Sequence, residues 1–116
     1  MTLTPINSGW IEVICGNMFS GKTEELIRRI RRAQIAKLST SIFKPKIDSR
    51  FSKDHIVSHN QEKMESFTID SPSDILKLVN KTQVIGVDEA QFFDESLIDI
   101  SKILASRGKR IIITGL

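Results

Sequence analysis

Apolar residues recur along this chain in short blocks separated by polar and glycine-containing stretches. Some blocks are four to six residues of nearly continuous apolar character, which is typical of buried β-strands. Pro45 follows one of them and is expected to close it. The sequence predicts five strands, over residues 10–15, 39–43, 64–69, 84–87 and 110–114.

Other blocks repeat at three- and four-residue steps, which is the spacing of one face of a helix. Residues 23–37 have this pattern, and so does a segment that begins near Leu97 and ends before Gly108, a plausible C-terminal stop. A helix is also predicted to begin at Ser71, with that hydroxyl as the cap and Pro72 in the first helical position.

The order of these blocks predicts a fold class. Strands that alternate with helices favour a mainly parallel sheet, and continuous apolar strands indicate that helices cover both of its faces. The sequence therefore predicts a three-layer α/β domain. The polar segment 46–61 has no clear period and is predicted to be a loop. The chain has 116 residues, which fits one domain over residues 1–116.

Composition narrows the class of protein. The hydrophobic share of 40% and the charged share of 27% are typical of soluble globular proteins. The apolar runs are far shorter than the roughly 20 residues of a membrane helix. The N-terminus does not resemble a signal peptide, and the single cysteine, Cys15, can form neither an internal disulfide nor a thiolate zinc cluster. We expect a cytoplasmic protein that has no membrane partner.

The chain is mildly basic, with 17 Lys and Arg against 14 Asp and Glu, a net charge of +3. This charge suits either a nucleic acid or a small phosphorylated ligand as partner. Four arginines cluster within residues 28–32, but their spacing favours the solvated face of a helix. Nucleic acid is therefore not the expected partner.

The most specific motif lies between the first predicted strand and the first predicted helix. It matches G-x-x-x-x-G-K-[ST], in which backbone amides wrap phosphates at the positive end of a helix. Lys22 can reach the β- and γ-phosphates, and the Thr23 hydroxyl can bind Mg²⁺. The predicted nucleotide-binding residues are Gly16, Asn17, Met18, Phe19, Ser20, Gly21, Lys22 and Thr23.

A second motif, Asp88-Glu89, follows the apolar run 84–87. Ligands bind at the carboxyl ends of parallel strands, so Asp88 can hold the Mg²⁺ that bridges nucleotide phosphates. Glu89 can then activate either water, as in a helicase-type ATPase, or a substrate hydroxyl, as in a small-molecule kinase. A helicase of this type needs two such domains, and the length of this chain favours the kinase.

The motifs together resemble one family, the type II (human cytosolic-like) thymidine kinases. The Met-Phe-Ser insert of the phosphate loop is more specific than the general loop pattern. The matching blocks are residues 16–29, Lys44-Pro45 with Asp48-Ser49-Arg50, Ser58-His59, residues 84–93 and Thr114-Gly115-Leu116.

The resemblance implies that ATP donates its γ-phosphate to the 5′-hydroxyl of thymidine, a salvage reaction that supplies DNA synthesis. Glu89 matches the general base of the family, and Arg50 matches an arginine that stabilises the charge on the transferred group. The resemblance assigns Thr23, Asp88 and Asp48 to the Mg²⁺ site, and Met18, Phe92 and Gln91 to the neighbourhood of the thymine base.

Members of the family are tetramers and also carry a small zinc domain with a loop that closes over the thymine. The zinc ligands are not among these 116 residues. We therefore expect this chain to bind nucleotide phosphates but to phosphorylate thymidine weakly or not at all, and to form a homo-oligomer. The alternatives are a nucleotide-binding or oligomerisation module without catalysis, or a P-loop ATPase that acts on nucleic acid.

Overall fold

The computed structural model describes residues 9–16, 21–46, 55–57 and 63–116. A five-stranded parallel sheet has the strand order β1-β7-β6-β2-β5, and a separate antiparallel pair is formed by β3 and β4. The strands are β1 (Trp10–Ile14), β2 (Thr40–Pro45), β3 (His55–Val57), β4 (Lys63–Glu65), β5 (Phe67–Ile69), β6 (Val84–Val87) and β7 (Arg110–Thr114). The helices are α1 (Lys22–Ile35), α2 (Ser73–Leu78), the short 3-10 helix η1 (Ala90–Phe92) and α3 (Ser96–Ser106).

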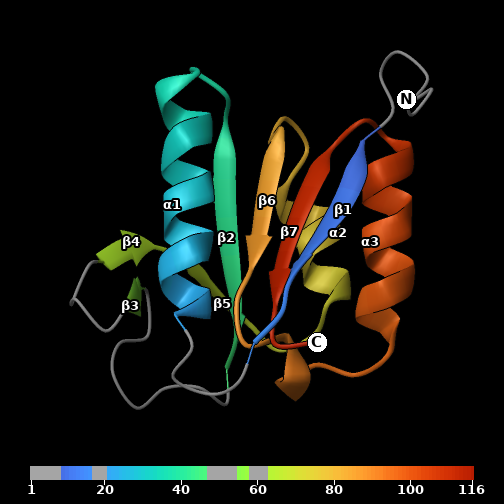
Figure 1. The fold of residues 1–116 in the computed structure, drawn as a ribbon. Coiled ribbons are helices and arrows are strands. Elements are labelled where there is room, and N and C mark those ends of the chain that lie inside the picture. The colour runs from blue at the N-terminus through green and yellow to red at the C-terminus, as the bar shows by residue number, and fades with distance from the viewer. Residues whose placement is uncertain (1–8, 17–20, 47–54, 58–62) are drawn as a thin grey trace.

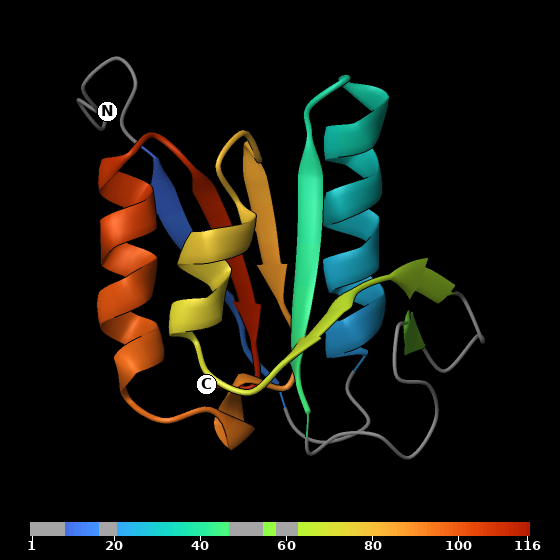
Figure 2. The ribbon, with the colours of Figure 1, turned by 180° about the vertical axis from the view of Figure 1, so that it is seen from behind.

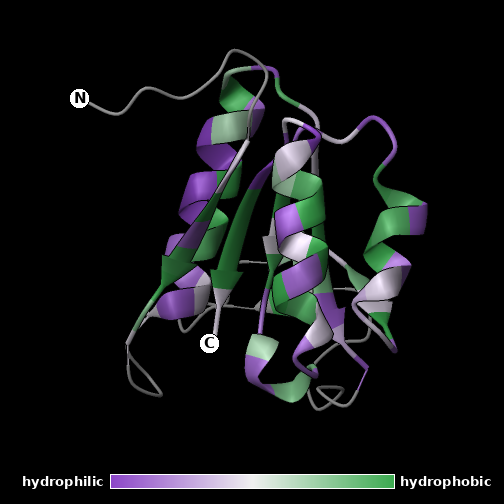
Figure 3. Ribbon diagram, turned by 90° about the vertical axis from the view of Figure 1, so that its right-hand side faces the viewer, coloured by the Kyte–Doolittle hydropathy of each residue, from purple (hydrophilic) through white to green (hydrophobic). Residues whose placement is uncertain are grey.

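Helices lie on both sides of the sheet. α1 packs on one face, and α2 and α3 pack on the other (Figures 1 and 2). The hydropathy view shows the central strands as mostly apolar and the helices as two-sided (Figure 3). The predicted three-layer α/β fold with a parallel sheet is therefore confirmed, as a P-loop, RecA-like arrangement.

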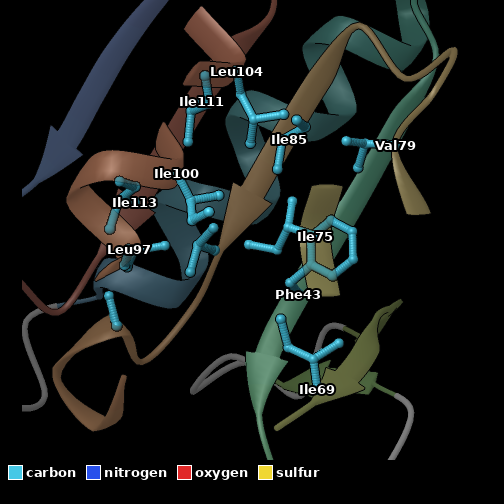
Figure 4. Packing of buried hydrophobic residues seen from close by; sticks show 12 residues of the cluster. Phe43, Ile69, Ile75, Val79, Ile85, Leu97, Ile100, Leu104, Ile111 and Ile113 are labelled. Carbon is cyan, nitrogen blue, oxygen red and sulfur yellow. The ribbon is translucent and has the colours of Figure 1, made fainter. Parts of the chain in front are cut away.

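Alternating side chains of the strands divide the core into two halves, because successive residues of a strand point to opposite faces. Ile112 of β7 packs with Leu26, Ile27 and Ile30 of α1. Its neighbours Ile111 and Ile113 pack on the other side with α3 (Figure 4). The central strands are thus apolar on both faces, and this explains why their sequences are continuous apolar runs.

Gly86 explains how α1 approaches the sheet. A Cβ atom built on Gly86 would lie 3.1 Å from Leu26 Cδ1 and 3.3 Å from Ile30 Cδ1. The absent side chain therefore lets the helix settle against β6. The N-terminus of α1 lies at the carboxyl end of the sheet (Figure 1).

Several sequence predictions were wrong in detail. Strand β2 ends at Pro45 as expected, but it includes Pro45 and so runs two residues beyond the predicted end at Phe43. Pro45 is tolerated there because β6 pairs with β2 only as far as Phe43. The predicted strand 64–69 is two strands, β4 and β5, which belong to different sheets. The segment 46–61, predicted to be a loop, contains β3, whose partner lies beyond that segment.

The predicted start of α2 also differs. Pro72, and not Ser71, occupies the cap position, with helical dihedral angles. The Ser71 hydroxyl still accepts a bond from the backbone amide of Ser73, the first helical residue, at 3.4 Å, and the Ser71 amide donates to Asp74 Oδ2 at 3.2 Å. Helix ends commonly differ by a residue between sequence patterns and structure.

The edge strand β1 is less covered than predicted. Trp10, Ile11 and Val13 keep exposed fractions of 52%, 38% and 42%. Glu12 ties this strand to its neighbours, because it accepts bonds from Trp10 Nε1 at 2.7 Å, from Arg29 of α1 at 2.8 Å and from Arg110 of β7. In the described residues, Arg28 and Arg29 also pair with Glu25, as expected for a solvated helix face.

The Glu12 cluster predicts a pH dependence of stability. Burial raises the pKa of Glu12. This effect is outweighed by the hydrogen bonds from Arg110 and Trp10, by the charge of Arg110 and by the hydrogen bond from Arg29. The pKa of Glu12 therefore lies below its ordinary value of 4.5. A carboxylate whose pKa is lower in the folded protein than in the unfolded chain stabilises the fold when the pH is above the pKa of the unfolded chain. That contribution is lost as the pH falls from 4.5 through the lower folded value.

Replacement of Glu12 by Gln is expected to lower the free energy of unfolding at pH 7 by about 1–2 kcal/mol, since charged hydrogen bonds of partly buried groups contribute on this scale. Urea titrations at pH 7 and pH 3.5 measure the effect, which should be smaller at the lower pH. Asp99→Asn, on the exposed surface of α3, is the control. An equal loss at both pH values would contradict this account.

Among the described residues, no helix is both long and apolar enough to cross a bilayer.

Candidate functional site

The ends of the predicted phosphate loop lie at the carboxyl end of the sheet. Gly16 follows β1, and Gly21 caps α1 in the left-handed conformation with φ 81°. A side chain would be strained at this φ, so the second glycine of the motif has a conformational reason. Lys22 and Thr23 are the first two residues of α1 and are half-buried. The predicted residues Asn17, Met18, Phe19 and Ser20 lie outside the described residues.

Thr23 meets Asp88 across the sheet end, although 65 positions separate them in the sequence. The Thr23 hydroxyl lies 3.3 Å from each carboxylate oxygen of Asp88. Asp88 is only 5% exposed, and its backbone amide donates to the Phe43 carbonyl of β2 at 2.9 Å. The structure therefore brings together two of the residues predicted for the metal site. Asp48, the third, lies outside the described residues, as does Arg50.

The oxygen atoms of Thr23 and Asp88 suit a magnesium ion. Mg²⁺ prefers oxygen ligands, and it is commonly held by one or two protein groups together with substrate phosphates and water. A buried carboxylate facing a hydroxyl at a helix N-terminus supplies such oxygens. Within the part of the chain that the structure describes, no group of three or more His, Cys, Asp and Glu side chains gathers as a metal cage.

Glu89 follows Asp88 in a backbone conformation that is uncommon for its residue type. Its φ of 54° and ψ of 44° are left-handed, and such a conformation costs a non-glycine residue about 1–3 kcal/mol. The reversal directs the chain from β6 into η1. The Glu89 carboxylate accepts a bond from Gln91 Nε2 at 2.8 Å. Two predicted site residues are therefore in direct contact.

Gln91 and Phe92 lie on η1, at the same end of the sheet as the start of α1 (Figure 1). Both are exposed, Phe92 by 51%. Gly115 accommodates Gln91, since a Cβ at Gly115 would lie 2.0 Å from Gln91 Oε1 and 3.0 Å from the Ala90 backbone nitrogen. This contact gives the last glycine of the chain a packing role beside the site.

Sequence reasoning missed one residue of this arrangement as a site residue. The hydroxyl of Thr114, at the end of β7, donates to Asp88 Oδ1 at 2.6 Å and accepts the Glu89 backbone amide at 3.2 Å. Thr114 is 1% exposed. Its position at the end of a strand adjacent to the Asp88 strand could have indicated it, but strand order is not visible in the sequence.

The fold and this geometry define a class of protein. In the described residues, strand β1, a helix that begins with Lys22 and Thr23 directly after Gly21, and an acidic pair after β6, which is separated from β1 by β7, follow the order of a P-loop, RecA-like fold. A family model described as "Thymidine kinase" matches residues 9–116. The chain belongs to the thymidine kinase family.

Two relatives illustrate the similarity. The thymidine kinase of Rhodothermus sp. (strain ITI 518) is 56% identical over 108 residues, which cover 93% of this chain and 51% of that protein. The thymidine kinase of Bacteroides thetaiotaomicron is 55% identical over 108 residues, covering 93% of this chain and 54% of that protein. The chain thus spans about half the length of the curated relatives that it matches.

Proposed function

We propose that this chain contains the nucleotide-binding domain of a thymidine kinase, which transfers the γ-phosphate of ATP to the 5′-hydroxyl of thymidine. One observation carries the proposal. The start of the phosphate-loop helix and the carboxylate at the end of β6 meet through Thr23 and Asp88, and Glu89 follows directly. Membership of the thymidine kinase family supports the choice of substrate.

The donor nucleotide is bound by positive and polar groups at one end of the sheet. Lys22 and the loop amides would hold the phosphates, and Thr23 and Asp88 would hold Mg²⁺, together with Asp48. When bound, Mg²⁺ neutralises the negative charge of the phosphates. Arg50 would add positive charge on the transferred group. Phosphoryl transfer depends mainly on such positioning and charge neutralisation.

Glu89 is the proposed base. A carboxylate near the substrate can accept the proton of the attacking hydroxyl as the new bond to phosphorus forms. Gln91 donates a hydrogen bond to this carboxylate, and the bond limits the rotation of the Glu89 side chain. The base remains on a short turn that is fixed at both ends, by β6 and by η1.

Phe92 supplies exposed apolar surface on the same turn, and we assign it with Gln91 and Met18 to the thymine end of the substrate. The proposal includes no nucleic-acid substrate, since two of the clustered arginines are paired with acids. The homo-oligomer stays a prediction from the resemblance, and the cytoplasmic location stays a prediction from composition.

Two measurements test the proposed function. Calorimetry of the 116-residue chain should detect ATP binding, and the full reading frame that contains it should transfer labelled γ-phosphate to thymidine. Uridine and deoxycytidine serve as control acceptors. ATP binding without transfer to any nucleoside would contradict the kinase and favour a nucleotide-binding module. ATP hydrolysis that rises with added single-stranded DNA would instead favour an ATPase acting on nucleic acid.

A further inference from the structure

We propose that Thr114 is a positioning residue for the metal-binding carboxylate and for the base. This inference rests on the proposed function and extends it to a residue that does not itself touch the reacting atoms. One buried hydroxyl bonds to both members of the acidic pair, to the side chain of Asp88 and to the backbone of Glu89.

Strand register places Thr114 beside this pair. Ile113 of β7 is paired with Val87, the last residue of β6, so the residues that follow them, Thr114 and Asp88, lie side by side at the sheet end. A hydroxyl has one hydrogen to donate and two lone pairs to accept with. Thr114 can therefore donate to Asp88 Oδ1 at 2.6 Å while it accepts the Glu89 amide at 3.2 Å.

The donated bond orients the Asp88 carboxylate. Thr23 is equidistant from both oxygens, at 3.3 Å, so that contact alone does not distinguish them. Thr114 contacts Oδ1 at a shorter distance and thereby fixes the rotation of the carboxylate plane. Because Thr114 is 1% exposed, bulk water has little access to replace the bond.

The accepted bond supports the turn that carries the base. Glu89 has a left-handed backbone, which is unfavourable for a residue with a side chain. The bond from its amide to Thr114 stabilises that conformation and hence the direction in which the Glu89 side chain leaves the strand. The same hydroxyl thus links the geometry of the metal site to that of the base.

The variant Thr114→Val tests this role, since it keeps the branched shape of the side chain and removes both bonds. In the 116-residue chain we expect Mg²⁺ to raise ATP affinity about 10-fold less than in the parent, with Mg²⁺-free ATP affinity changed by less than about twofold. Thr114→Ser, which keeps the hydroxyl, should restore the Mg²⁺ effect. Isothermal titration with and without Mg²⁺ measures both.

A matched control is Ser101→Ala. Ser101 is also 1% exposed and donates to the Leu97 carbonyl within α3, away from the site. This variant removes a buried hydroxyl at a distance from the site and is expected to leave the Mg²⁺ effect unchanged. If Thr114→Val does not fold, Thr114→Cys replaces it, because a thiol is a much weaker donor of similar size.

In the full reading frame, Thr114→Val should lower kcat for thymidine about 10- to 100-fold, with the KM for thymidine within about twofold, since misplacement of catalytic groups costs on this scale. An unchanged Mg²⁺ effect on ATP binding, or loss of the effect in Thr114→Ser as well, would overturn the proposal. If the parent protein transfers no phosphate to thymidine, the proposed function fails, and the Mg²⁺ titration still decides the role of Thr114.

Discussion

Replacement of Glu89 by Gln is expected to lower phosphoryl transfer to thymidine by about 10²- to 10⁴-fold, the usual contribution of a general base. The amide has nearly the same size as the carboxylate, and its oxygen can still accept the bond from Gln91. It cannot accept a proton from the substrate hydroxyl. ATP affinity should change by less than about threefold, since the proposed phosphate contacts come from Lys22 and the loop amides.

The measurement compares kcat and the dissociation constant for ATP in the full reading frame. Glu95→Gln is the matched control, because Glu95 is an exposed acid beside the start of α3 and belongs to no proposed contact with substrate. Its turnover should equal that of the parent. Unchanged turnover in Glu89→Gln would remove Glu89 as the base, and a parallel loss of ATP affinity would instead make it a binding residue.

Replacement of Lys22 by Met is expected to weaken ATP binding at least 100-fold in the 116-residue chain. Lys22 is the first residue of α1, where backbone amides already favour an anion. A single pair of charges 4 Å apart contributes about 4 kcal/mol at an effective dielectric constant of 20, and the triphosphate carries several charges. The methionine side chain has similar length but no charge.

Lys102→Met is the control for this variant, since Lys102 is exposed on α3, away from the start of α1. It changes the net charge equally and should leave ATP affinity within about twofold at physiological salt, where distant surface charges are screened. Equal losses in the two variants would indicate a nonspecific charge effect. Unchanged affinity in Lys22→Met would place nucleotide binding elsewhere.

The two variants separate binding from chemistry. Lys22→Met is expected to fail at the first step, and Glu89→Gln is expected to bind ATP and fail at transfer. A protein that only binds nucleotides would respond to the first change and show no measurable consequence of the second.

Helix α1 and strand β7 were predictable because their signals are local. The apolar residues of α1 repeat every three or four positions, and the buried residues of the helix follow this spacing: Leu26, Ile27, Ile30 and Ala33. The isoleucines of β7 are buried on both faces of the sheet. A helix that is buried on one face, or a strand that is buried on both, has a characteristic spacing of apolar residues. This spacing can be recognised without knowing which distant residues the element packs against.

Strands β3, β4 and β5 were not predicted correctly, because their structure depends on distant pairing. β5 adds to the sheet through Phe43 to Pro45 of β2, and β4 pairs with β3. Strands β3, β4 and β5 have only three residues each. So short a run has no reliable period, and its partner decides its conformation.

The fold class, the phosphate-loop motif, the acidic pair and the resemblance to thymidine kinases could be recognised from the sequence alone. Each of them depends on patterns of residues that are close together in the chain. The tertiary structure decided how the acidic pair is held. Thr23, Asp88 and Thr114 come from α1, the end of β6 and β7, and only the sheet order makes them neighbours. Thr114 belongs to one of the blocks that resemble the family, but that block assigns it no role. Its relation to the site follows from the pairing of β6 with β7, which packing of the whole chain establishes.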